Sequence, residues 1–189
     1  MTSSIKHTFI KNKVFLIALI AIIVLLVTYA SAWFKLDSMA KGYYADAMRN
    51  YESGKIMAAL KGEKVLSADS SEYIYHGGFE QVVDAFRSKF AFPKPQVYYL
   101  AESKIENILQ KNITPEIGYA IYKKFFRLDN EYLGDILIRI GDIYHAKKNF
   151  PEALKAYNLA EESFPFNSVI AGQANKKIHD LDASISHFQ

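Results

Sequence analysis

The longest run of hydrophobic positions lies near the N-terminus. Residues 14–34, from Val14 to Phe34, include no charged side chain. As a helix, this run would extend about 31 Å at ~1.5 Å per residue, which matches the hydrocarbon core of a bilayer. Tyr29, Trp33 and Phe34 lie at its C-terminal end, where aromatic side chains favour a membrane interface. The pattern predicts a transmembrane helix over residues 14–34, preceded by a basic tail over residues 1–13.

A cleaved signal peptide is the alternative for this segment. Ala30-Ser31-Ala32 has the small-x-small form of a cleavage site. The apolar run is longer than the roughly 7–15 residues typical of a signal peptide, which favours an uncleaved signal anchor. Three lysines and no acid precede the run, and Lys35, Lys41 and Arg49 follow it. The positive-inside rule therefore favours an N-terminus in the cytoplasm through a weak asymmetry, helped by the clustering of Lys11 and Lys13 next to the run. Under both alternatives, residues 35–189 are expected on the extracytoplasmic, periplasmic side.

Farther along the chain, residues 133–166 have the hydrophobic period of two short helices. The break between them falls at 148–150, where Pro151 fits a first helical turn. Gly141 and Ala153 lie twelve residues apart, and we expect the two helices to cross there. The apolar positions of the first helix are Ile136, Leu137, Ile140, Ile143 and Tyr144, and those of the second are Ala153, Leu154, Tyr157, Ala160 and Phe164.

This hairpin resembles a tetratricopeptide repeat, a family whose hallmark is a spaced Leu-Gly-Tyr followed by Ala, an aromatic residue, Ala and Pro. Leu137 stands where the family has its early Trp, and Lys148 replaces its turn Gly. The resemblance implies a helical-repeat fold that binds proteins, without naming a partner. The repeat-packing positions that it implies are Gly141, Tyr144, Ala153, Tyr157, Ala160 and Pro165.

Two other stretches resemble weaker copies of the same unit. Residues 96–130 place Gly118, Tyr122 and Phe125 thirty-five residues before Ala153, Tyr157 and Ala160, close to the family period. In this stretch Thr114 is expected to cap a helix that begins at Pro115. Residues 39–69 repeat the twelve-residue spacing of small residues with Ala47 and Ala59, and Leu60 and Leu66 continue the apolar stripe of the second helix. An ordinary helical hairpin is the alternative for residues 39–69.

The remaining segments flank these units. Residues 72–97 contain an amphipathic helix with Phe79, Val82, Val83, Phe86 and Phe90. This insertion would serve either as a docking element or as core. Residues 168–187 form a last amphipathic helix, which would cap the repeat stack or, alternatively, provide a coiled-coil seam. The sequence thus predicts an all-α chain in which a transmembrane helix precedes a short, tetratricopeptide-like α-solenoid over residues 35–189, ending in a C-terminal capping helix.

Charge and composition argue against several classes of function. The net charge of +3 comes from Lys6, Lys11 and Lys13, and the rest of the chain is balanced. A nucleic-acid-binding domain would show a basic surplus in its folded part, so nucleic acid is not an expected partner. The chain has no cysteine, and its five histidines are scattered without metal-ligand spacing. It also lacks a phosphate-binding loop and a nucleophile elbow. We therefore expect no metal, no cofactor and no enzymatic activity.

Two functions remain. The chain is expected to be a membrane-anchored module that binds proteins, as a scaffold or assembly factor for an envelope or membrane complex. The alternative is a permanent structural subunit of such a complex. The bilayer is the expected second partner, through residues 14–34. By family resemblance, the first helix of each unit would line a partner-binding groove, made by Asp135, Ile138, Asp142 and His145 as one exposed stripe, then Ser103, Asn107 and Gln110, then Tyr44, Met48 and Tyr51.

Overall fold

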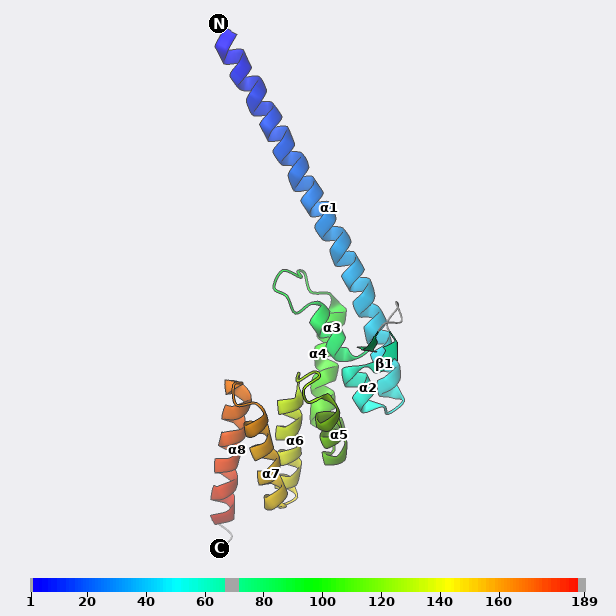
Figure 1. Cartoon of the computed structure of the whole chain (residues 1–189), viewed down its shortest axis with the longest axis vertical. Coiled ribbons are helices and arrows are strands. Elements are labelled where there is room, and N and C mark those ends of the chain that lie inside the picture. The colour runs from blue at the N-terminus through cyan, green and yellow to red at the C-terminus, as the bar shows by residue number, and fades with distance from the viewer. Residues whose placement is uncertain (1, 67–71, 187–189) are drawn as a thin grey trace.

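The computed structural model describes residues 2–66 and 72–186, with side chains described for residues 15–66 and 72–183 (Figure 1). Within these ranges the chain is mostly helical, with eight α-helices, one π-helical turn and one two-stranded sheet. The sheet departs from the predicted all-α class. A long N-terminal helix projects from a folded body made by the rest of the chain (Figure 1).

Helix α1 runs without a break from Thr2 to Glu52. It therefore joins the predicted basic tail, the predicted span and the start of the predicted 39–69 unit in one element. All of its large apolar side chains from Phe15 to Val27 are exposed. This helix is long and apolar enough to cross a membrane, by length and composition. Toward its C-terminal end, Ala40 and Ala47 are fully buried, so the same helix enters the folded body.

The second half of the predicted 39–69 unit is only partly helical. Helix α2 spans Ile56–Lys61 and ends at Gly62, whose φ of +85° suits glycine. Strand β1 (Glu63–Leu66) then pairs antiparallel with β2 (Tyr73–His76), with Glu63 opposite His76. Leu66, which the helical pattern placed in the buried stripe, is half exposed in β1. The hairpin replaces the predicted helix at this point.

The next elements do not form the helical hairpin predicted for residues 96–130. Helix α3 spans Phe79–Ala85, α4 spans Gln96–Asn107 and continues as a π-helical turn over Ile108–Asn112, and α5 spans Pro115–Phe125. Helix α4 packs mainly on α3, whereas α5 packs on α6. At the start of α5, the Thr114 hydroxyl accepts from the Ile117 amide at 3.3 Å, which confirms the predicted cap.

The C-terminal helices match the predicted boundaries. Helix α6 spans Leu133–Ala146, α7 spans Phe150–Ser163 and α8 spans Ser168–Ser186. Helices α5 to α8 pack one against the next (Figure 1), and α8 buries Ile170, Ala174 and Leu181. Gly141 lies against the ring of Tyr157 on α7, where a Cβ would clash with Cε1, and Ala153 is fully buried.

Candidate functional site

The predicted stripe on α6 is not an exposed surface. Ile138 is only 8% exposed, and Asp135, Asp142 and His145 are half-buried. Asp142 Oδ1 accepts from the Tyr157 hydroxyl at 2.8 Å and from Lys177 Nζ at 2.6 Å. Helices α7 and α8 thus engage part of the face that the sequence pattern left free. The prediction of one exposed stripe is wrong, because the pattern of α6 alone does not show which helices pack on it.

The earlier positions of the predicted groove are divided between surface and core. Ser103 and Gln110 are exposed on α4 and the π-helical turn. Tyr44, Met48 and Tyr51 on α1 are half-buried, and the rings of Tyr44 and Tyr51 meet Phe79 edge-on, with centroids 5.5 and 6.4 Å away. The Tyr51 hydroxyl also reaches Asn107 Oδ1 at 3.4 Å. Their role in partner binding stays a prediction.

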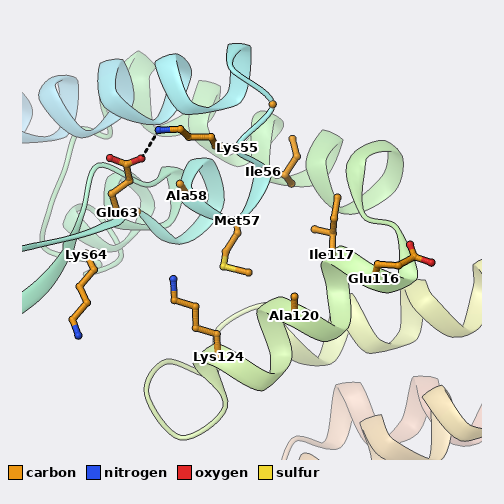
Figure 2. A pocket seen from close by; sticks show the side chains of 12 residues that line it. Lys55, Ile56, Met57, Ala58, Glu63, Lys64, Glu116, Ile117, Ala120 and Lys124 are labelled. Atoms are coloured by element: carbon orange, nitrogen blue, oxygen red, sulfur yellow. Dashed lines mark hydrogen bonds and ion pairs between the residues drawn. The ribbon is translucent and has the colours of Figure 1, made fainter.

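A groove lies elsewhere, between α2 with β1 on one side and α5 on the other (Figure 2). Its volume is about 680 Å³. Met57 projects from α2 toward α5 in this view, and Lys124 reaches back from α5. The lining residues come from the α1–α2 turn, α2, the start of β1 and one face of α5: Gly54, Lys55, Ile56, Met57, Ala58, Gly62, Glu63, Lys64, Glu116, Ile117, Ala120 and Lys124.

The wall of the groove is apolar and its rim is charged. Ile56, Met57 and Ile117 supply the larger apolar side chains. On the rim, Lys55 and Glu63 form an ion pair at 3.0 Å. Within the described ranges, Lys64 and Lys124 have no carboxylate within ion-pair distance. Each ammonium instead lies near an aromatic ring. The Lys64 ammonium is 4.7 Å from the centroid of the Tyr73 ring, and the Lys124 ammonium is 5.4 Å from the centroid of the Tyr75 ring. The rim therefore carries two lysines available to an acidic group.

Glu116, at the other end of the groove, belongs to the helix start. It lies in the first turn of α5, where a carboxylate is stabilised by the helix N-terminus. Hydrogen bonds from its own backbone amide and from Thr114 lower the pKa of its carboxyl group. Its charge is thus already engaged by α5.

A second charged cluster has a buried ion pair, Lys61–Glu80, at its centre. The Lys61 side chain is 0% exposed, and its ammonium lies 2.7 Å from Glu80 Oε2 and 3.0 Å from Asp129 Oδ2. It also donates to the Glu131 carbonyl oxygen at 2.8 Å. Burial raises the pKa of Glu80 to about 8, and the neighbouring ammonium opposes that rise. Because Lys61 and Glu80 are buried and the cluster joins α2, α3 and the α5–α6 loop, we assign it a structural role.

Sequence reasoning missed both the groove and this cluster. Lys61 reads as a surface residue in a linear pattern, because lysine is rarely buried without a partner. The groove joins residues from α2 and α5 that are about sixty positions apart, and no motif marks it. Among the residues with described side chains, no group of three histidine, aspartate or glutamate side chains could hold a metal ion.

Comparison with known proteins adds no family. No protein-family model matches the chain, no curated protein matches it in sequence, and no solved structure matches it. The tetratricopeptide resemblance therefore stays a prediction from the residues of the α6–α7 hairpin. The structure itself shows a mostly helical fold with one long apolar N-terminal helix.

Proposed function

We propose that the chain is a membrane-anchored module that binds a protein partner and holds it close to the bilayer. The observation that carries this proposal is the continuity of α1. Its N-terminal half exposes apolar side chains such as Phe15 and Leu25, which are both 69% exposed, whereas Ala40 and Ala47 near its other end are fully buried in the folded body. A single rigid helix would thus connect the bilayer to the body without a flexible linker.

Retention of the span is part of this proposal. The Tyr29 hydroxyl donates to the Phe90 carbonyl oxygen at 2.9 Å, so a residue upstream of the candidate cleavage site Ala30-Ser31-Ala32 contacts the folded body. Cleavage there would remove that contact. Three lysines precede the apolar run, which supports an N-terminus in the cytoplasm and a body on the periplasmic side.

The groove between α2 and α5 is the surface that we propose for the partner. An extended segment with apolar side chains would fill the wall at Met57 and Ile117, and acidic side chains would reach Lys64 and Lys124. Such a partner would be a subunit of an envelope or membrane complex, for which this chain would act as scaffold or assembly factor. The tetratricopeptide resemblance supports protein binding in general, and the groove supplies a specific location.

The test compares capture by three forms of the full chain in mild detergent. Ala120 is an exposed residue on the groove face of α5, so Ala120→Glu adds bulk and negative charge without disturbing the core. Ala45→Glu on α1 is the matched control, because Ala45 is also exposed and helical but lies outside the groove. We expect the wild type and Ala45→Glu to capture the same partner, identified by mass spectrometry, and Ala120→Glu to lose it. Equal capture by all three forms would exclude the groove.

A permanent structural subunit is the second candidate, and one surface favours it. Leu128, Phe166 and Val169 are 69%, 101% and 63% exposed. They lie on or beside the α5–α6 and α7–α8 loops. These two loops are neighbours, because Asn130 of one and Asn167 of the other line the same small cavity. Apolar side chains gathered at one end of a fold suit a constant neighbour. Under this alternative the purified chain would self-associate in detergent, and replacing Leu128 and Phe166 with serine would make it monodisperse.

A further inference from the structure

The loop between α3 and α4, residues 88–95, exposes two aromatic rings. Phe90 is 75% exposed and Phe92 is 71% exposed, although both would be expected in a core. The segment 87–95 contains Arg87, Lys89 and Lys94 and no acidic residue. Arg87 pairs with Asp84 and Glu131, and Lys94 donates to the Phe86 carbonyl oxygen, so Lys89 is the exposed cation of the loop. In Figure 1 this loop projects from the end of the body that faces the N-terminal part of α1. An apolar and basic loop of this kind suits an anionic membrane surface.

Helix α1 holds this loop through two aromatic side chains. The Tyr29 hydroxyl lies within hydrogen-bond distance of the carbonyl oxygens of Phe90, at 2.9 Å, and of Phe92, and its single proton is shared between them. One turn later, the Trp33 indole nitrogen donates to the Pro93 carbonyl oxygen at 2.8 Å. Tyr29 and Trp33 belong to the C-terminal end of the apolar run. The loop is therefore fixed beside the part of α1 that would emerge from the bilayer.

The position along α1 sets the depth of the loop. Tyr29 lies five residues before Phe34, or about 7.5 Å along a helix at ~1.5 Å per residue. If residues 14–34 fill a hydrocarbon core of about 30 Å, the contact at Tyr29 lies about 7.5 Å inside its edge, in the outer half of one leaflet. Phe34 is 66% exposed at the edge itself, so aromatic rings of α1 and the loop cover the depth between Tyr29 and the interface, which aromatic side chains favour.

The backbone of the loop is suited to that depth. Irregular backbone is tolerated near the hydrocarbon only where its polar groups are bonded within the protein. The Phe90 amide donates to the Ser88 hydroxyl at 3.2 Å, and the Phe92 amide donates to the Tyr29 hydroxyl at 3.1 Å. The Ala91 amide donates to the Ser88 carbonyl oxygen at 3.0 Å. The amides of Phe90, Ala91 and Phe92 are thus bonded inside the loop or by α1, while both phenylalanine side chains are exposed.

From these observations we infer that residues 88–95 form a second membrane contact, in which Phe90 and Phe92 insert at the boundary between acyl chains and headgroups. Lys89, which is exposed, would face the phosphates of anionic phospholipids. This contact would restrict the tilt of the body relative to the bilayer, because the chain would then contact the membrane at two places, the span and the loop. The inference rests on the proposed anchor, and it assigns to the loop a role that the span alone does not supply.

The test measures depth with single nitroxide labels, for which the cysteine-free sequence is suited. The full chain would be reconstituted into vesicles of equal parts phosphatidylcholine and phosphatidylglycerol. Three variants carry the label: Phe90→Cys in the 88–95 loop, Val24→Cys in the span and Phe166→Cys in the loop between α7 and α8. All three native side chains are more than half exposed, so the substitutions leave the core intact. Collision rates with oxygen, which concentrates in lipid, are compared with those of a water-soluble nickel chelate.

We expect the labels at Val24 and Phe90 to collide several-fold more with oxygen than with the chelate, and the label at Phe166 to show the reverse. A label at Phe90 that behaves like the one at Phe166, while Val24 remains in lipid, would overturn the loop contact and leave the anchor standing. A label at Val24 that collides freely with the chelate would overturn the anchor and the loop contact together. If the label at Phe166 also reports lipid, the contact is not specific to the loop and the inference fails.

Discussion

Lys61 and Glu80 form an ion pair that is almost wholly removed from solvent, with 2.7 Å between Nζ and Oε2 and side-chain exposures of 0% and 2%. The pair connects α2 to α3, and Asp129, at 3.0 Å from the same ammonium, adds the α5–α6 loop. Removing charges from water is unfavourable unless partners compensate them. The close approach of three segments therefore depends on each charge keeping its partner.

Replacing Lys61 alone should lower the denaturant concentration at which the body unfolds. At about pH 9, above the Glu80 pKa of about 8, Lys61→Met leaves an ionised Glu80 buried without its cation, so we expect a loss of about 3–5 kcal/mol in the free energy of unfolding. The double variant Lys61→Met with Glu80→Leu removes both charges and should recover part of that loss. Denaturation of the full chain in detergent micelles, followed by circular dichroism, gives both values. A double variant no more stable than Lys61→Met would contradict the pairing.

The same pair predicts a pH dependence of stability. The pKa of Glu80 is about 8 in the folded state, against 4.5 for an unperturbed glutamate, so the folded chain binds the proton more tightly than the unfolded chain. This contribution to stability is complete below about pH 4.5 and is lost as pH rises to about 8. The free energy of unfolding should fall across that window, and Glu80→Gln should flatten the fall. An identical pH profile for both forms would show that Glu80 does not titrate in this range.

Gly141 gives a test of the α6–α7 contact. Its missing side chain admits the Tyr157 ring, which is fully buried. Gly141→Ala should overpack that contact and lower the free energy of unfolding by about 1–3 kcal/mol. Gly172→Ala on α8 is the matched control, because a Cβ there meets nothing within 4 Å. This control should raise stability by about 0.5–1 kcal/mol, as alanine does in a helix interior. Melting temperatures that shift in the same direction for both variants would contradict the contact.

The parts of the fold that could be predicted from sequence are those whose signals are local. A long uncharged run marks α1, and a three-to-four-residue period with a break at Lys148 marks α6 and α7. A cap followed by proline marks the start of α5, because Thr114 and Pro115 satisfy the first turn whatever the surroundings. Each of these signals depends on neighbours within a few residues. Their success therefore says little about how the helices pack.

The errors concern pairings between distant segments. Leu66 continues a helical period in the sequence, yet Gly62 turns the chain and β2 supplies a strand partner. Ile138 and Asp142 look free on α6, but Ile138 is buried and Asp142 bonds to Tyr157 and Lys177. The groove is a product of how α2 faces α5, which no local pattern contains. The tetratricopeptide resemblance and the partner-binding residues drawn from it stay predictions.

The central claim is that residues 14–34 remain attached and anchor the body to a membrane. Alkaline carbonate extraction of membranes carrying the full chain, followed by mass determination of the N-terminal peptide, tests it most directly. We predict that the chain stays in the membrane pellet with its apolar run intact, because the exposed apolar side chains of α1 require lipid and Tyr29 contacts the loop at Phe90. A chain released by carbonate, with a mature N-terminus at Trp33, would contradict the account.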